Sequence, residues 1–361
     1  MEDKKYYIYD IETYPNCFLF TGKFFRSSNI DTFEISPRKN DRDKLLAHLS
    51  YLKNCNAIMV GYNNLGFDYP ITHELLSNPY TFGFEKARQI CNEIFTRREY
   101  GATIIYAKDR IIPQLDLMKM NHFDNKARRT RLKDLQFAMR IQSVEDLPFD
   151  PNKDLTMDQI DWLIKYNIHD VVATEEFLNK NSEQIKMRQE LIENRIIYGD
   201  VLNYSDVRIG VEYLIRKIGK ERCFVSPGKP RQTFREMISF KEIILPKIYF
   251  RTQVYEDVYN WFTQQKVYPN GSTPAPSLET RLAGIDFKFG IGGVHASVEN
   301  KVFHSSDTHV IRDIDVSGMY VAVAIANGFY PEHLGQAFVE AYKQLQSDRR
   351  KYSKGTTMNA L

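Results

Sequence analysis

Two carboxylates stand close together near the start of the chain, at the end of a stretch that predicts a β-strand. Residues 5–12 read Lys-Tyr-Tyr-Ile-Tyr-Asp-Ile-Glu and are rich in β-forming residues. Asp10 and Glu12 are two positions apart, so both side chains are expected on one face of the strand. Carboxylates held this close repel each other unless they are protonated or bound to cations, and divalent cations fill this role in phosphate chemistry. A solvated strand end is the alternative explanation of the pair.

A second acidic candidate follows a short apolar run over residues 57–62, which predicts another strand. The segment Asn64-Leu-Gly-Phe-Asp68 comes directly after this run. Gly66 is expected to permit a sharp turn that brings Asp68 toward the end of the sheet. Taken by itself, the segment is also explained by an ordinary turn.

The third candidate lies in the best-marked helix of the chain, which is expected over residues 155–178. Thr156 and Gln159 have the spacing of a capping box, and apolar residues repeat behind them at helical intervals. Tyr166 and Asp170 are four residues apart, which places them on one face of the helix. A surface aspartate with a tyrosine packed on its edge is the alternative.

These residues occur in the order Asp10, Glu12, Asp68, Asp170, with Tyr166 four positions before the last. Together with the Asn-containing segment that ends in Phe-Asp, the set resembles the proofreading exonuclease domain of family B DNA polymerases, within the DEDD exonuclease superfamily. The resemblance implies a ribonuclease H-like fold in which the four carboxylates hold two Mg²⁺ or Mn²⁺ ions.

The resemblance also assigns roles to neighbouring residues. It implies that Tyr166 orients the attacking water and that Asn64 and Phe67 contact the DNA strand. Relatives that use a histidine place it five residues before the final aspartate; Lys165 stands there, so the tyrosine branch fits, and His169 is expected to be structural. In two-metal hydrolysis, one ion lowers the pKa of a bound water and the other stabilises the leaving 3′ oxygen.

Several further residues could contribute to such a site. Lys133 matches a family lysine that contacts the scissile phosphate, with a solvated helix lysine as the alternative. Asp116 resembles part of a family segment beside the active site and is assigned no metal. Arg128, Arg129 and Arg131 belong to a basic run with aromatic residues nearby, which suits a frayed single strand of DNA. A solvated charged face is the competing account of that run.

The last part of the chain resembles a different region of the same polymerases. The segment Asp315-Val-Ser-Gly-Met-Tyr320 resembles the first palm motif, which implies that Asp315 binds catalytic metal and that Tyr320 packs under the incoming sugar. Residues 290–293 read Gly-Ile-Gly-Gly and resemble a segment that contacts DNA, which would involve Gly292 and Gly293. An ordinary tight turn explains these glycines as well.

The alternation of strand and helix patterns predicts an α/β fold class with three segments. Residues 1–185 are expected to form the exonuclease domain, a ribonuclease H-like mixed sheet with flanking helices. A helical connecting region with a linker is expected over 186–285, and a truncated α+β palm with the start of the fingers over 286–361. Further expected elements are a helix over 85–98, strands over 103–107 and 310–315, and helices over 182–220 and 334–350.

Composition narrows the classes of protein. The 361 residues are 43% hydrophobic, with a net charge of +3, so binding of nucleic acid must come from a local patch. Four cysteines without a CxxC pair disfavour a disulfide framework or a zinc ribbon and favour a reducing setting. The sequence shows neither a membrane span nor the apolar segment of a signal peptide, which disfavours export and membrane insertion. Together with the resemblance to phage- or virus-type polymerases, this implies the cytoplasm of a phage-infected host as the expected location.

The leading hypothesis is the N-terminal part of a phage- or virus-type family B DNA polymerase with a complete 3′→5′ exonuclease and an incomplete palm. Its partners would be DNA, as a single-stranded 3′ end or a primer-template, and a second polypeptide that carries the remaining palm, fingers and thumb. One alternative is a stand-alone DEDD exonuclease acting on RNA or DNA ends. Another is a DNA-binding subunit without catalytic activity.

Overall fold

The chain divides into two compact units in a computed structural model. The first unit comprises residues 1–217 and 344–361, and the second comprises residues 218–343. The functional boundaries expected at 185 and 285 stay predictions, because a division by compactness does not test them. The structure describes residues 5–97, 105–127, 129–141, 147–244, 249–268, 274–316 and 318–351.

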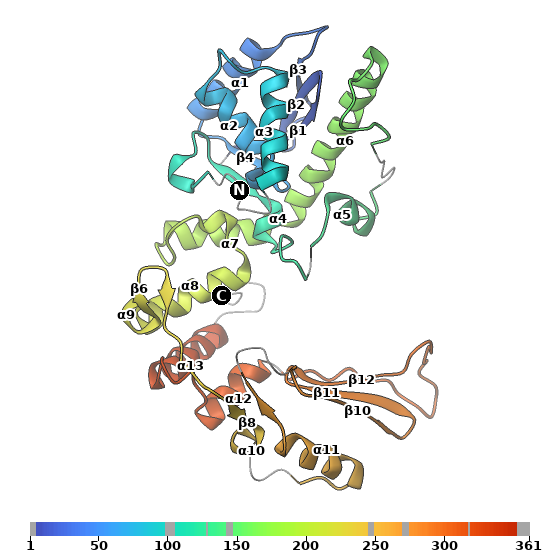
Figure 1. The fold of residues 1–361 in the computed structure, drawn as a ribbon, viewed down its shortest axis with the longest axis vertical. Coiled ribbons are helices and arrows are strands. Elements are labelled where there is room, and N and C mark those ends of the chain that lie inside the picture. Colours follow the sequence, from blue (N-terminus) through green and yellow to red (C-terminus); the bar gives the residue numbers. More distant parts are fainter. Residues whose placement is uncertain are drawn as a thin grey trace. The chain divides into compact units, whose positions relative to one another are not determined.

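A five-stranded mixed sheet forms the centre of the first unit (Figure 1). Its strands, in the spatial order β3-β2-β1-β4-β5, are β3 (Asp31–Ile35), β2 (Cys17–Phe24), β1 (Tyr6–Tyr14), β4 (Ile58–Gly61) and β5 (Gln114–Asp116). β2 pairs antiparallel with β1 and with β3, whereas β4 runs parallel to both β1 and β5. This arrangement confirms the prediction of an α/β fold built on a mixed sheet.

Helices cover both faces of this sheet (Figure 1). One layer contains α1 (Arg42–Asn54), α2 (Asp68–Ser77) and α3 (Phe84–Arg97). The other contains α6 (Met157–Lys180) and α7 (Ser182–Glu193), together with the short helices α4 (Leu117–Met120) and α5 (Leu132–Ala138). Each layer buries its own apolar cluster against the sheet.

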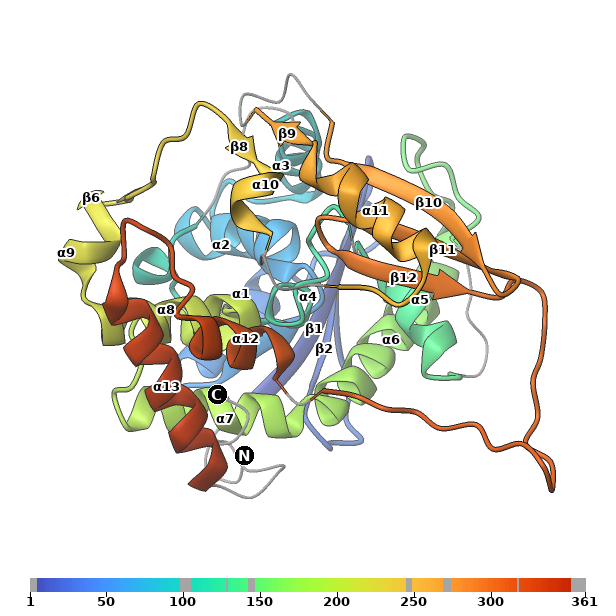
Figure 2. The same ribbon diagram turned by 90° about the horizontal axis from the view of Figure 1, so that it is seen from below.

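Alternate residues of β1 face opposite layers, as the pleat of a strand requires. Tyr9 and Ile11 are buried among apolar side chains of α1, α2 and α3. Ile8 is buried instead with side chains of α6 and α7. Asp10 and Glu12 continue the set that contains Ile8, so they emerge on the face along which α6 runs (Figure 2).

The start of α6 is fixed by local hydrogen bonds. Thr156 Oγ1 accepts from the Gln159 backbone N–H, and Gln159 Oε1 accepts from the Thr156 backbone N–H, which confirms the capping box. Asn16, in the turn between β1 and β2, exchanges two 2.9 Å hydrogen bonds with the backbone of Leu155. These contacts set the position of the helix along the sheet, and therefore the height at which its polar residues meet β1.

Two element predictions in the first unit are wrong. A strand was expected over residues 103–107, but 105 and 106 lie outside any strand and Ala107–Asp109 form the short 3₁₀ helix η2, while 103 and 104 fall outside the described residues. The helix expected over 182–220 is interrupted after α7, and helical structure resumes at η3 (Val201–Asn203) and α8 (Asp206–Ile218). The interruption has a backbone cause, since Arg195 (φ 53°) and Gly199 (φ 105°) adopt left-handed conformations.

The second unit is built from short elements around a three-stranded antiparallel sheet. Tyr255 of α11 (Gln253–Thr263) packs its ring against Phe287 and Phe289 on one face of this sheet. The sheet consists of β10 (Ser277–Leu282), β11 (Ile285–Gly290) and β12 (Gly293–Ser297). The other elements are α9 (Lys220–Cys223), β6 (Phe224–Ser226), β7 (Lys229–Pro230), β8 (Ile238–Ser239), α10 (Phe240–Ile243), β9 (Lys266–Val267) and α12 (Met319–Asn327). The helix α13 (Gln336–Lys351) begins in this unit, and its residues from 344 onward belong to the first unit.

The strand expected over residues 310–315 does not form. These residues are exposed and belong to no helix or strand. A strand requires neighbours for its backbone hydrogen bonds, and no described segment pairs with this one. The helix expected over 334–350 is confirmed as α13. Within the described ranges, no helix combines the length and apolar character needed to cross a bilayer.

Candidate metal centre

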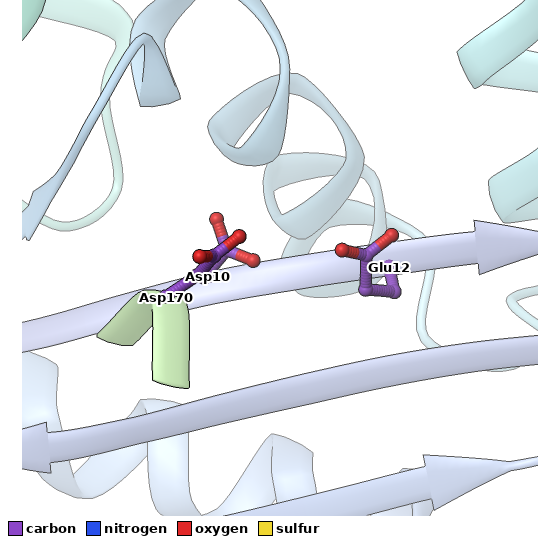
Figure 3. A group of neighbouring side chains, drawn as sticks. All are labelled: Asp10, Glu12 and Asp170. Carbon is purple, nitrogen blue, oxygen red and sulfur yellow. The ribbon is translucent and has the colours of Figure 1, made fainter. Parts of the chain in front are cut away.

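Three carboxylates from two elements meet beside β1, whose central residue is Asp10. Asp10, Glu12 and Asp170 each offer one oxygen, and these oxygens lie within 4.8 Å of one another. Figure 3 shows the first two side chains on β1 and the third on α6. Asp170 is buried, and the other two are half-buried. Residues separated by 160 positions in the sequence therefore form one acidic cluster.

The fourth predicted carboxylate, Asp68, lies beside this cluster. It is the first residue of α2, and its Oδ1 accepts a 3.1 Å hydrogen bond from the backbone N–H of Ile11. Ile11 separates Asp10 from Glu12 along β1, so Asp68 is tied to the same stretch of strand. Its charge raises the pKa of both neighbouring carboxyl groups, which places it within electrostatic reach of the cluster.

The turn that delivers Asp68 differs from the expectation. The left-handed residue is Asn63 (φ 64°), whereas the expected glycine, Gly66, has no positive φ. The space beside Gly66 is tight instead, because a Cβ there would lie 2.6 Å from Asn63 Oδ1 and would require that side chain to move. The buried carboxylate of Asp116 accepts hydrogen bonds from the backbone N–H groups of Asn63 (3.0 Å) and Leu65 (3.1 Å), which holds the turn to the end of β5.

Asp116 joins this turn to two further segments. Its Oδ1 also accepts hydrogen bonds from the N–H groups of Met118 (3.0 Å) and Lys119 (3.3 Å), which caps α4. Its own backbone N–H donates to Asn203 Oδ1 at 2.7 Å. Four backbone donors thus converge on one carboxylate, and Asp116 acts as a connector between β5, α4 and the turn before Asp68.

Burial and mutual repulsion make ionisation of the acidic cluster unfavourable. Burial, followed by the charges of Asp170 and Asp68, raises the pKa of Glu12 to about 8. Burial raises the pKa of Asp68 to about 7. The pKa of Asp10 is raised well above its usual value by burial and by the three neighbouring carboxylates.

The donor set is suited to hard divalent cations. Every candidate ligand in the cluster is a carboxylate oxygen, the type that Mg²⁺ and Mn²⁺ prefer. A bound cation would offset the repulsion that raises the pKa values of these groups. A metal ion therefore fits this buried acidic cluster.

Tyr166 and Lys133 are both brought to the cluster. The Tyr166 hydroxyl hydrogen-bonds to Asp170, and its pKa is raised by burial and by the charges of Asp170 and Glu12. Lys133 lies in α5. Burial raises the pKa of Glu12 and of Asp170, and the ammonium group of Lys133 partly offsets this rise. The structure therefore places a phenol and a cation beside the acidic cluster, and the roles predicted for them stay predictions.

Two buried amides at the site were not predicted. Gln136 Nε2 in α5 donates to Asp170 Oδ1 at 2.7 Å, and Asn167 Nδ2 in α6 donates to Asp10 Oδ2. Asn167 falls inside the Tyr-Asn-Ile-His-Asp segment, so its position next to Tyr166 was an available signal. Gln136 carries no such signal, because its contact depends on how α5 packs against α6.

The two residues expected to contact DNA near Asp68 are buried, one completely and the other in part. Asn64 is completely buried, and its Nδ2 donates to Gln114 Oε1 at 2.9 Å. The same oxygen accepts a 2.9 Å hydrogen bond from the Tyr9 hydroxyl. Phe67 is half-buried, with its ring centre 5.9 Å from that of Phe95. Contact between these residues and DNA stays a prediction.

The basic run is only partly described. Arg129 and Arg131 are exposed, and Arg131 binds Asp134 through its backbone N–H and its guanidinium group. Arg128 lies outside the described residues. His169 is half-buried, with Nδ1 3.8 Å from Asp170 Oδ1. None of these observations tests the roles predicted for these residues.

The glycines predicted to contact DNA form a hairpin turn in the second unit. Gly292 lies in the two-residue connection between β11 and β12, and Gly293 (φ 138°) pairs with Gly290 across it. Asp315 is exposed and outside any strand, and Tyr320, the second residue of α12, is 75% exposed. The metal and nucleotide contacts expected of these residues stay predictions.

The search for related proteins adds no family. A scan against protein-family models gives no match, and a search of curated proteins gives none either.

Proposed function

We propose that the first unit is a 3′→5′ exonuclease of the DEDD type, tyrosine branch, which hydrolyses the terminal phosphodiester of a DNA strand with two divalent metal ions. The observation that carries this proposal is the convergence of Asp10, Glu12 and Asp170 within 4.8 Å, with Tyr166 hydrogen-bonded to Asp170. Asp68 beside this cluster supplies the fourth carboxylate.

The fold supports the same proposal. A mixed sheet flanked by helices is the architecture expected of a ribonuclease H-like domain, and here two of the carboxylates lie on its central strand. Asp10 and Glu12 share one face of β1, and α6 carries Asp170 onto that face. The sequence order of the motifs thus corresponds to neighbouring positions in space.

Each side chain has a task that suits its chemistry. Two divalent ions, when bound, would supply the charge that makes water acidic near neutral pH and stabilises the leaving 3′ oxygen. The four carboxylates would hold these ions, and the Tyr166 hydroxyl, itself fixed by Asp170, would orient the attacking water. Lys133 would place its positive charge against the scissile phosphate, where charge develops during the reaction.

The wider proposal is that the chain is the N-terminal part of a phage- or virus-type family B DNA polymerase acting in the cytoplasm of its host. The palm-like segment from Asp315 to Tyr320 supports it. Nucleotidyl transfer on a primer-template would then depend on the remaining palm and fingers.

A single assay tests the nuclease. The full chain is incubated with 5′-labelled single-stranded DNA or RNA, in Mg²⁺ or EDTA, beside Asp10→Ala and the exposed-carboxylate control Asp109→Ala. Stepwise shortening of DNA from its 3′ end is expected, and it should require Mg²⁺ and Asp10 but not Asp109. A preference for RNA would favour a stand-alone nuclease instead. Binding without cleavage would contradict an enzymatic role.

A further inference from the structure

We infer that Gln136 and Asn167 are positioning residues that fix two carboxylates of the metal site, and that the site requires the uncharged N–H donors of their amides. This inference rests on the proposed metal-dependent nuclease and extends it to residues that touch neither metal nor substrate.

The two amides connect three elements through the carboxylates. Gln136 on α5 donates to Asp170 on α6, and Asn167 on α6 donates to Asp10 on β1. Both amide side chains belong to residues with 0% exposure. Because a buried hydrogen bond restricts the rotation of a carboxylate, each contact fixes the direction in which the second oxygen of that carboxylate can point.

The lack of charge on these donors is what suits a metal site. A lysine or arginine would also hold a carboxylate, but its charge would offset the negative charge that attracts a cation. The contrast lies on the same helix, where Glu175 of α6 accepts from the ammonium group of Lys23. Asp10 and Asp170 instead accept from amides, and Asp170 also accepts from the Tyr166 hydroxyl.

The other half of each amide gives independent support. Gln136 Oε1 and Asn167 Oδ1 are buried and have no hydrogen-bond partner among the described residues. A buried oxygen without a hydrogen-bond partner lowers the stability of the fold by about 1–3 kcal/mol through its desolvation. An apolar side chain of similar shape carries no such desolvation penalty. A role limited to packing would therefore favour leucine at both positions. The reversed amide would place its oxygen against a carboxylate oxygen, so the N–H donor is the group that the site uses.

The test measures Mn²⁺ affinity of the full chain by calorimetry without DNA, for the wild type, Gln136→Leu and Asn167→Leu. Each substitution is expected to weaken Mn²⁺ binding about 10–100-fold, the usual effect of losing a partner of a metal ligand. In EDTA, the unfolding temperature of each variant should stay close to that of the wild type, because removal of the unsatisfied oxygen offsets the loss of the hydrogen bond to the carboxylate.

The matched control is Asn181→Leu. Asn181 is a buried amide at the end of the same helix, and its Nδ2 donates to the Phe177 carbonyl at 2.7 Å. This control should lower the unfolding temperature and leave Mn²⁺ affinity unchanged. If a leucine variant fails to fold, Gln136→Met or Asn167→Ala removes the same donor, with the same loss of affinity expected.

Unchanged Mn²⁺ affinity in folded variants at both positions would overturn the inference. The experiment distinguishes failure of this inference from failure of the nuclease proposal. If the wild type binds Mn²⁺ but cuts no nucleic acid, lower affinity in the variants still supports the positioning role while the nuclease proposal fails. A wild-type chain that binds no Mn²⁺ overturns both.

Discussion

The ammonium nitrogen of Lys133 lies 5.4 Å from the centre of the Tyr166 ring. A cation over an aromatic face is held by the electrostatic attraction of the ring, so this contact restricts where the lysine can place its charge. It also links α5 to α6 directly beside the acidic cluster. Two residues from different helices are thereby held together as a phenol and the cation that lies over its ring.

Lys133→Met should slow DNA cleavage without unfolding the chain. Methionine keeps the length of the side chain but removes the charge that we propose faces the phosphate, and the loss of one such group lowers kcat by about 100-fold or more. The control is Lys165→Met, because Lys165 is exposed on α6 next to Tyr166 in the sequence. Single-turnover cleavage in Mg²⁺ measures the effect. Equal rates for both variants would remove Lys133 from the mechanism.

Tyr166→Phe should lower the rate of cleavage more than the binding of DNA. The substitution removes the hydroxyl that hydrogen-bonds to Asp170 but retains the ring under Lys133. Loss of a group that orients water reduces kcat by about 100-fold, while DNA affinity should stay within about twofold. Fluorescence anisotropy in EDTA gives the affinity, and the exposed Tyr106→Phe serves as control. A variant that cuts at the wild-type rate would argue against any role for the hydroxyl.

The stability of the metal-free chain should fall as pH rises from about 6.5 to 8.5. The folded-state pKa values of Glu12 (about 8) and Asp68 (about 7) exceed the ordinary values of 4.5 and 3.8. The folded state therefore binds more protons than the unfolded state in this window, and the resulting stabilisation is lost as pH passes through the raised pKa values.

Chemical denaturation in EDTA measures this dependence. The pH window excludes the titration of His48. Burial lowers the pKa of His48, so this residue reduces the stability of the fold only as pH falls below about 6.5, the ordinary value for histidine. Glu12→Gln cannot ionise at this position, so its free energy of unfolding should change less across the window. Mg²⁺ should restore stability to the wild type most strongly at pH 8.5. An identical slope in Glu12→Gln would contradict the raised pKa.

Asp116→Asn should destabilise the first unit and reduce cleavage, although Asp116 lies outside the acidic cluster. The asparagine side chain keeps one acceptor oxygen and replaces the other with an NH₂ group. That NH₂ group would face backbone N–H groups that donate to the carboxylate in the wild type. We expect a loss of about 3 kcal/mol in the free energy of unfolding, from the buried donors left unsatisfied. The exposed Asp109→Asn should change this free energy by less than about 0.5 kcal/mol. Urea titration of both variants gives the comparison.

The sequence was informative where a residue pattern determines geometry locally. The two-residue spacing of Asp10 and Glu12 requires a shared face in any strand, and the capping box fixes the start of α6. The strand β5 escaped prediction because three residues are too few for a periodic pattern. Gly66 was assigned the conformational freedom that Asn63 uses, since both residue types tolerate a positive φ.

Tertiary contacts account for most of what sequence patterns missed. Gln136 reaches Asp170 only because α5 packs on α6, and no spacing within residues 132–138 reports that contact. Residues 310–315 include the β-branched Val310, Ile311 and Ile314, which favour a strand, yet a strand forms only with a partner. Sequence patterns therefore indicated carboxylates that lie close together in the structure, but not the amides that hydrogen-bond to them.

The alternating burial along β1 has a consequence for which changes the site can tolerate. Any insertion or deletion of one residue between Ile8 and Asp10 would exchange the two faces of the strand beyond that point. Asp10 and Glu12 would then turn toward the apolar layer of α1, α2 and α3, and Ile11 would turn toward α6. A change in the length of this strand is therefore more damaging than most substitutions within it, because it disables the chemistry and the core in one step.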